Sequence, residues 1–195
     1  FDVAFQADPT LSGLCDNPAS NAGVLQALSV LVSEHPGTEL PNLVKPSVFD
    51  EVLDISMRAI PWRTPETFTG ETRAVVRKGL ARGTGEALDA VLAVCAQPSS
   101  IDAQWLSSVL SQFDLTQRDA VWSGYLHQRF EDNGIVRRLI TAADDLELRK
   151  LDEDTATRWA TMLLWFTAAA DRRVKDNATR ALVAICRAKP AIIPQ

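Results

Sequence analysis

Asp119, Ser123 and His127 are the residues of this chain whose types and spacing come nearest to nucleophilic catalysis. Intervals of four residues place all three on one face of a helix, where a carboxylate could orient a histidine beside a serine. Side chains on one helix, however, point outward side by side, whereas the groups of a catalytic triad converge from separate elements. The spacing therefore favours a solvated helix face, and we predict no catalytic residue.

Two carboxylate pairs, Glu131-Asp132 and Asp144-Asp145, are the other candidates for acid–base chemistry. Both pairs stand beside expected helix ends, where solvated surface carboxylates are the more common explanation. The two histidines and three cysteines are scattered along the chain and never approach a zinc spacing such as C-x2-C. We therefore expect no metal site and no bound cofactor.

A proline-bounded loop carries the first residues that could bind a partner protein. Trp62 and Arg63 stand between Pro61 and Pro65. An exposed aromatic residue beside an arginine is typical of a binding hot spot. We favour the alternative, in which Trp62 packs across the ends of adjacent helices.

The second candidate for partner binding is a basic corner that comprises Arg172, Arg173 and Lys175. On the edge of a helical array this corner could receive an acidic partner or a phosphate group. We favour a structural role for its charges. In that case Asp171 caps the following helix, and Asp176 pairs with Arg180 at a spacing of four residues.

Composition indicates an ordinary soluble protein that does not bind nucleic acid. Of the 195 residues, 46% are apolar and 23% are charged. The net charge is −5, and the part of the chain before Arg137 is the acidic part, whereas nucleic-acid binding needs a basic surface. No apolar run approaches the roughly 20 residues of a membrane span, and the start of the chain lacks the features of a signal peptide. Cys15, Cys95 and Cys186 are expected to be reduced core thiols in a cytoplasmic protein.

In the segments between proline and glycine positions, the apolar residues recur with the period of a helix and do not alternate as in a strand. Capping residues such as Thr69 and Asp152 mark helix starts, and Pro36, Pro61 and Pro98 mark helix ends. We therefore predict an all-α fold of about nine helices and no strand. The expected helices cover residues 20–34, 48–60, 69–81, 84–97, 100–113 (or from Asp102), 116–130, 135–143, 152–170 and 174–188. In the helix over 116–130 we expect a capping box that starts at Thr116, and an inner face formed by Val121, Trp122, Tyr125 and Leu126.

The last two expected helices have the character of a repeat unit. The penultimate one carries two apolar stripes, which indicates that other helices pack on both sides of it. The last one has a narrow stripe that is rich in small residues, formed by Val174, Ala178, Ala181, Leu182 and Ile185. Such a pair cannot bury its faces alone and needs neighbours. The pattern predicts one irregular α-solenoid domain over 1–195, with a possible sub-boundary near 61–68.

Several segments resemble known helical-repeat proteins. The corner from Asp171 to Lys175, followed by Ala178, Ala181 and Leu182, resembles the second-helix signature of HEAT-type repeats, with Lys in place of the usual Arg. Residues 163–182 resemble the helical region of large bacterial signal-transduction NTPases of the STAND class, several of which act in defence against phage. Residues 56–68 and 118–130 resemble other segments of that region. The resemblance covers residues 37–188, and no single motif in it is diagnostic.

The resemblance implies a fragment of a larger protein, because the phosphate-binding motif of such NTPases is missing. That motif is G-x-x-x-x-G-K-[ST], and its nearest counterpart here, Gly79 to Gly85, lacks the lysine and is a helix–helix turn. The chain also starts without Met. We expect a non-catalytic scaffold whose partner is another protein or a sister domain of its parent chain. The alternatives are a self-assembling helical adaptor and, ranked lower, a small all-α enzyme.

Overall fold

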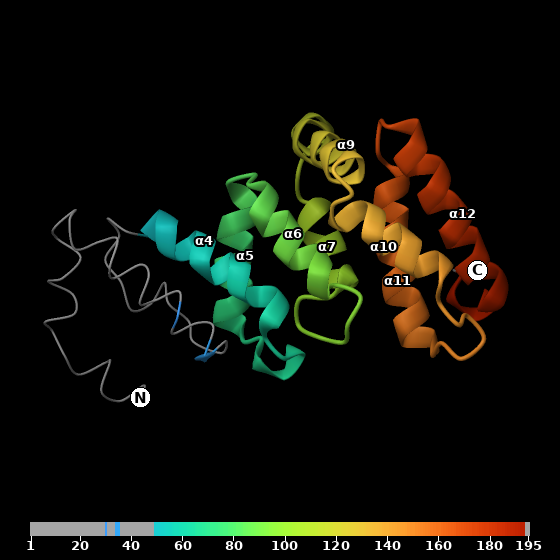
Figure 1. Cartoon of the computed structure of the whole chain (residues 1–195), viewed down its shortest axis with the longest axis horizontal. Helices are drawn as coiled ribbons and strands as arrows, with labels where there is room; N and C mark the ends of the chain where they lie inside the picture. The colour runs from blue at the N-terminus through green and yellow to red at the C-terminus, as the bar shows by residue number, and fades with distance from the viewer. Residues whose placement is uncertain (1–29, 31–33, 36–48, 194–195) are drawn as a thin grey trace, which may run out of the picture. The chain divides into compact units, whose positions relative to one another are not determined.

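The computed structural model describes residues 30, 34–35 and 49–193, and every regular element in them is helical (Figure 1). The predicted all-α class is confirmed for this part of the chain, whereas most of the helix expected over 20–34 lies outside the described residues. With α8, η5 and α9 counted as one continuous helix, the described residues form eight helices besides short 3-10 turns. The α-helices are α4 (Phe49–Ala59), α5 (Gly70–Ala81), α6 (Gly85–Val94), α7 (Ala103–Leu110), α8 (Leu115–Arg118), α9 (Gly124–Glu131), α10 (Ile135–Asp144), α11 (Glu153–Thr167) and α12 (Arg172–Ala188); the other elements are the 3-10 turns η3 (Ile60–Trp62), η4 (Pro65–Thr67) and η6 (Pro190–Ile192) and the π-helical turn η5 (Asp119–Ser123).

The chain divides into two compact units, Phe1–Ala90 and Val91–Gln195. The division falls within α6, and the loop at 61–68, where the sequence suggests a sub-boundary, belongs to the first unit. Each unit buries apolar side chains of its own.

In the first unit, α4 packs against α5, and a glycine makes the close approach possible. A Cβ placed on Gly79 would lie 3.0 Å from Met57 Sδ and 3.1 Å from Ala87 Cβ. A larger residue would therefore force these side chains to shift, and overpacking of this kind destabilises a core. The described core of this unit comprises Leu53, Met57, Ile60, Phe68, Val75, Val76, Leu80, Ala87, Leu88 and Ala90.

Side-chain caps fix where α5, α7 and α11 begin. Thr69 forms a capping box with Thr72 at the start of α5. Asp102, not Ser100, caps α7 through the Trp105 amide, and Asp152 caps α11 through the Thr155 amide. Each cap satisfies an amide that has no partner inside its helix. The predicted starts at 69, 102 and 152 are confirmed.

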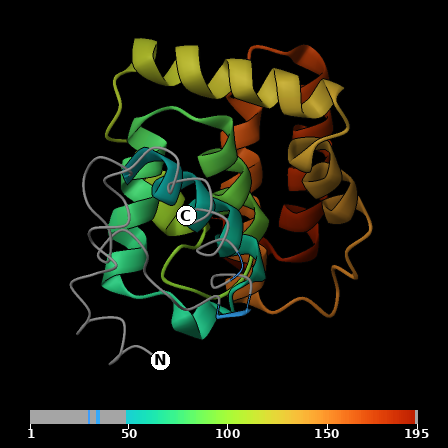
Figure 2. The same cartoon turned by 60° about the vertical axis from the view of Figure 1, so that its left-hand side comes forward.

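In the second unit, α11 contacts α7 and α12, so it packs on two sides as its two apolar stripes predict (Figures 1 and 2). Met162, Leu163 and Phe166 are fully buried. Trp165 and Trp159 are half-buried, and the Trp165 carbonyl oxygen accepts a hydrogen bond of 2.9 Å from Trp122 Nε1. No helix within the described ranges is both long and apolar enough to cross a membrane.

The small-residue stripe of α12 is the surface that meets its neighbours. Val174, Ala178, Ala181 and Ile185 are completely buried, and Leu182 is half-buried. α12 contacts α9, α10 and α11. Short side chains let these helices approach closely, since ridge-to-groove spacing depends on side-chain size at the contact. The stripe therefore lies in the interface of α12 with its neighbouring helices.

The helix over 115–131 departs from the sequence prediction in two ways. It begins at Leu115, so Thr116 is not an N-cap, and residues 119–123 form the π-helical turn η5. A π turn has more residues per turn than an α-helix and so rotates side chains away from α-helical positions. Trp122, Tyr125 and Leu126 are buried as expected, but Val121 is 43% exposed. The inner position assigned to Val121 is wrong for this reason.

Candidate functional site

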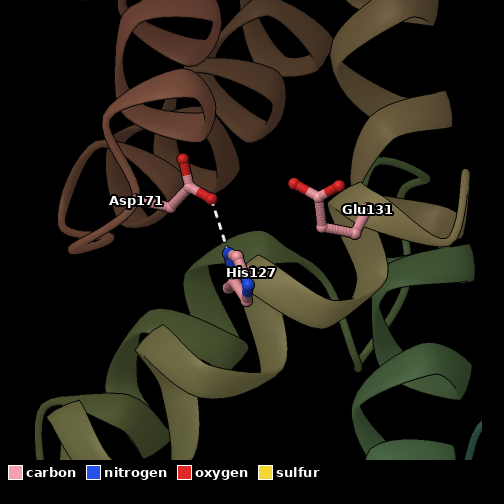
Figure 3. Close-up of side chains that lie close together, drawn as sticks. All are labelled: His127, Glu131 and Asp171. Carbon is pink, nitrogen blue, oxygen red and sulfur yellow. Dashed lines mark hydrogen bonds and ion pairs between the residues drawn. The ribbon is translucent and has the colours of Figure 1, made fainter.

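A group of four interacting polar side chains lies between α9 and the start of α12. His127 and Glu131 are four residues apart on α9, so they share a face of that helix. Asp171 is the N-cap of α12, and its Oδ1 accepts a hydrogen bond from the Arg173 amide. Because α9 contacts α12, the cap residue is brought next to both α9 side chains (Figure 3). We call His127, Glu131, Asp171 and Arg173 the α9–α12 cluster.

His127 and Asp171 are hydrogen-bonded within the cluster, with Nδ1 and Oδ2 2.6 Å apart (Figure 3). An ionised carboxylate can only accept, so Nδ1 carries the hydrogen and donates it to Asp171. The Asp171 side chain is 9% exposed, whereas that of His127 is 56% exposed. Asp171 is thus fixed in place by the fold, while the imidazole meets it from the solvent side.

Arg173 joins the two carboxylates of the cluster. Its guanidinium forms an ion pair with Glu131 and lies 3.0 Å from Asp171 Oδ2. Hydrogen bonds from Arg173, and then from His127, hold the pKa of Asp171 well below its usual range. The same carboxylates, Asp171 before Glu131, raise the pKa of the Arg173 guanidinium. Each charge of the cluster therefore has an opposite charge beside it.

His127, Glu131 and Asp171 also have the composition of a metal site. One ligand atom from each residue lies within 4.8 Å of the others, and imidazole with carboxylates is a donor set that transition metals accept. Arg173, however, already supplies a positive charge to both carboxylates. A metal ion would have to displace that guanidinium. The geometry accordingly describes an ion-pair cluster that ties α12 to α9.

The charges of the basic corner mostly have intramolecular partners. Arg172 Nε lies 3.2 Å from Asp176 Oδ2, and Arg180 lies 2.8 Å from Asp144. The expected pairing of Asp176 with Arg180 is therefore wrong, because a carboxylate on α10 reaches Arg180 and leaves Asp176 to Arg172. The expected cap by Asp171 is confirmed. Lys175 is exposed.

The two residues of the proline-bounded loop face opposite ways. Trp62 is 81% exposed, so the expectation that it packs on the helix ends is wrong. Arg63 is 6% exposed, and its Nη2 donates to the Thr67 carbonyl oxygen at 2.6 Å and to Thr72 Oγ1 at 3.1 Å. The guanidinium also lies 5.4 Å from the centre of the Phe68 ring, a cation–π distance. Arg63 therefore fixes the loop, and Trp62 alone of the pair is presented to solvent.

The remaining candidates are the line of Asp119, Ser123 and His127 and the three cysteines. His127 is bonded to Asp171, which belongs to another helix, so the line of Asp119, Ser123 and His127 is not a linked relay. Cys95 and Cys186 are free thiols, Cys95 buried and Cys186 half-buried, whereas Cys15 lies outside the described residues. Burial raises the pKa of the Cys95 thiol to about 12. A thiol in that state is a poor nucleophile.

The α9–α12 cluster is what the sequence reasoning missed. The available signal was the four-residue spacing of His127 and Glu131, which puts both on one helix face. The approach of Asp171, 44 positions along the chain from His127, depends on how α9 and α12 pack. In comparisons with known proteins, no family model, no curated protein and no solved structure matches the chain.

Proposed function

We propose that this chain is a non-catalytic helical scaffold that binds another protein. The observation that carries the proposal is Trp62, the most exposed large apolar side chain of the described residues, on a loop fixed by a buried arginine. Tryptophan is enriched among the residues that dominate protein–protein binding energies. A loop that is already ordered loses little conformational entropy when it binds, which favours affinity.

The arrangement of the helices supports a repeat-type scaffold. Consecutive helices pack as pairs in α4 with α5, α9 with α10, and α11 with α12. Pairs of this kind are the building units of α-solenoids such as HEAT arrays. We propose that these pairs belong to an irregular solenoid in a larger bacterial NTPase of signalling or phage defence. The sister domains of that parent protein are then the first candidate partners.

Substitution of Trp62 tests the binding part of the proposal. Recovery of the full reading frame should reveal a phosphate-binding loop outside this chain, and the module that contains it should bind the chain in a pull-down of purified proteins. Trp62→Ala should weaken that binding by about tenfold or more. The matched control is Leu164→Ala, which removes another exposed apolar side chain, 59% exposed on α11, and should leave binding unchanged.

Two results would overturn the proposal. A purified chain that hydrolyses ATP above background, with the activity retained through further purification, would contradict the non-catalytic part. Equal loss of binding in Trp62→Ala and Leu164→Ala would contradict the role given to the loop. Light scattering provides a further check, because a defined oligomer that persists on dilution would favour a self-assembling adaptor.

A further inference from the structure

The outward face of α5 carries four exposed cations within the part of the first unit that the structure describes. Arg73, Arg77 and Lys78 are exposed on this helix, and Arg82 is exposed at its C-cap. The helix contains one carboxylate, Glu71, which lies in the first turn. Val75, Val76 and Leu80 occupy the opposite, buried face. The cations therefore line the side of α5 that meets solvent.

Helix electrostatics accounts for only part of this charge. Lys78 and Arg82 stand at the C-terminal end, where the helix dipole favours cations. Arg73 lies near the N-terminal end, where the dipole favours anions. Arg73 and Arg77 are also four residues apart, a spacing at which like charges repel each other. Their placement works against the local stability of α5.

No carboxylate within the described residues pairs with Arg73 or Arg77. The second unit shows the contrast, since Arg172, Arg173 and Arg180 each lie beside at least one carboxylate there. A partner that binds the paired arginines must first compete with their intramolecular carboxylates. A partner that binds Arg73 and Arg77 meets no such competitor among the carboxylates of the described residues.

We propose that the outward face of α5 binds an acidic segment of a partner protein, whose carboxylates pair with Arg73 and Arg77. This inference rests on the proposed scaffold function and gives it a second surface with a defined chemistry. Each guanidinium can hold a carboxylate by two parallel hydrogen bonds, which lysine cannot do. Ala74 and Ala81 lie between the two arginines and Lys78 around the helix, and their small exposed side chains let a partner backbone approach the cations.

An acidic protein segment fits this face better than a nucleic acid. The whole chain has a net charge of −5, so a long polyanion would be repelled outside this single helix face. A short acidic segment needs only the local cations. Both kinds of ligand weaken with salt, so salt dependence alone does not separate them.

Fluorescence anisotropy with a labelled oligoglutamate peptide tests the proposal on the full chain at low salt. The wild-type chain should bind the peptide and should not bind an oligoglutamine peptide of equal length. The double substitution Arg73→Gln/Arg77→Gln should weaken binding by about tenfold or more, and Arg73→Lys/Arg77→Lys should restore only part of it. Both positions are exposed, so circular dichroism should show an unchanged fold.

Arg172→Gln/Lys175→Gln is the matched control, because it removes two exposed charges from the second unit and should leave peptide binding unchanged. Absence of wild-type binding, or equal weakening by the control, would overturn the proposal. Tighter binding of a DNA duplex that also depends on Arg73 and Arg77 would assign the face to nucleic acid instead. If the peptide experiment fails, the scaffold function can still hold, because it is tested separately by the loss of partner binding in Trp62→Ala.

Discussion

At the scale of single residues, the Asp171 side chain makes three interactions. One of its oxygens caps α12, and the other accepts a hydrogen bond from His127 of α9. Arg173 then bridges Asp171 to Glu131. The same carboxylate caps the start of α12 and attaches that helix to α9. A change at this position therefore acts on the local cap and on the packing of α9 with α12.

Asp171→Asn should separate these interactions, since asparagine caps a helix as well as aspartate but has no charge. The folded-state pKa of Asp171 is lowered, so its charge stabilises the fold fully above the unfolded pKa of about 3.9, and that contribution is lost progressively as pH falls from there through the folded pKa. We expect the variant to lose about 1 kcal/mol of unfolding free energy at pH 7. Urea titrations at pH 7 and pH 3 should show this difference shrink in acid.

Asp176→Asn is the control, because Asp176 pairs with Arg172 on the exposed surface of α12. Its cost at pH 7 should not exceed about 0.5 kcal/mol. A loss in Asp171→Asn that is equal at both pH values would contradict the electrostatic account of the cluster.

Cys95 provides a second prediction at this scale. Its thiol is fully buried with a pKa of about 12, whereas Cys186 is half-buried. Iodoacetamide reacts with the thiolate, so at pH 8 Cys186 should be modified in the native protein while Cys95 is protected until the protein unfolds. Peptide mass spectrometry over time measures both rates. Labelling of Cys95 at the rate of Cys186 would show that the core around α6 opens readily.

At the scale of elements, the short turn between α9 and α10 shows how closely consecutive helices approach. Asn133 has a positive φ of 54°, and Gly134 then serves as the N-cap of α10. A Cβ on Gly134 would lie 2.7 Å from the Arg129 carbonyl oxygen. That oxygen belongs to the backbone of α9, so it cannot move away without disturbing the helix.

Gly134→Ala should therefore destabilise the protein, by about 1–3 kcal/mol if the clash costs as much as overpacking in a core. Gly124→Ala is a matched control, because a Cβ there would meet nothing within 4 Å. In the helical conformation of Gly124, alanine should stabilise the protein by about 0.5–1 kcal/mol. Denaturant midpoints measure both, and the same sign for the two variants would contradict the turn geometry.

The elements that the sequence predicted well are those with strong local signals. Caps at Thr69, Asp102, Asp152 and Asp171 act within one turn, so residue type and spacing suffice to find them. The orientation of Val121 could not be predicted, because no residue pattern in the sequence indicates a π turn. The α9–α12 cluster was missed for a related reason, since its contacts depend on the packing of helices distant in sequence.

The loop at Trp62 was predicted as a loop, but the orientation of its side chains was predicted wrongly. Prolines correctly marked the segment as an irregular connection, and the structure has two 3-10 turns there. Which of Trp62 and Arg63 would face inward depended on hydrogen-bond acceptors at Thr67 and Thr72. An arginine with several partners can be buried, and its aromatic neighbour is then left outside.

At the scale of the whole molecule, the chain divides into two units within α6, and each unit buries apolar side chains of its own. Leu163 lies in the second core and Met57 in the first, and each is at most 1% exposed. Because a cavity weakens the unit that contains it, Leu163→Ala should cost about 2–5 kcal/mol and raise amide exchange in α11 and α12 while α4 and α5 keep their protection.

Met57→Ala is the reciprocal test. It should raise amide exchange in α4 and α5 and leave α11 and α12 as they are in the wild type. Hydrogen exchange followed by mass spectrometry measures both patterns. A uniform loss of protection in either variant would show that the described residues unfold as one cooperative body.

The π-helical turn over 119–123 should allow the helix over 115–131 to lose one residue without a break. A single π turn amounts to one extra residue held inside an otherwise regular helix. Deletion of Ala120, which is exposed, should therefore be absorbed by conversion of the turn to α-helix, without a break in the helix. The deletion would instead alter how the residues on the two sides of the turn face their neighbours. Arg118, which lies 5.4 Å from the Trp165 ring, and Tyr125, whose ring lies 6.0 Å from that of Trp122, are the contacts that would report the change.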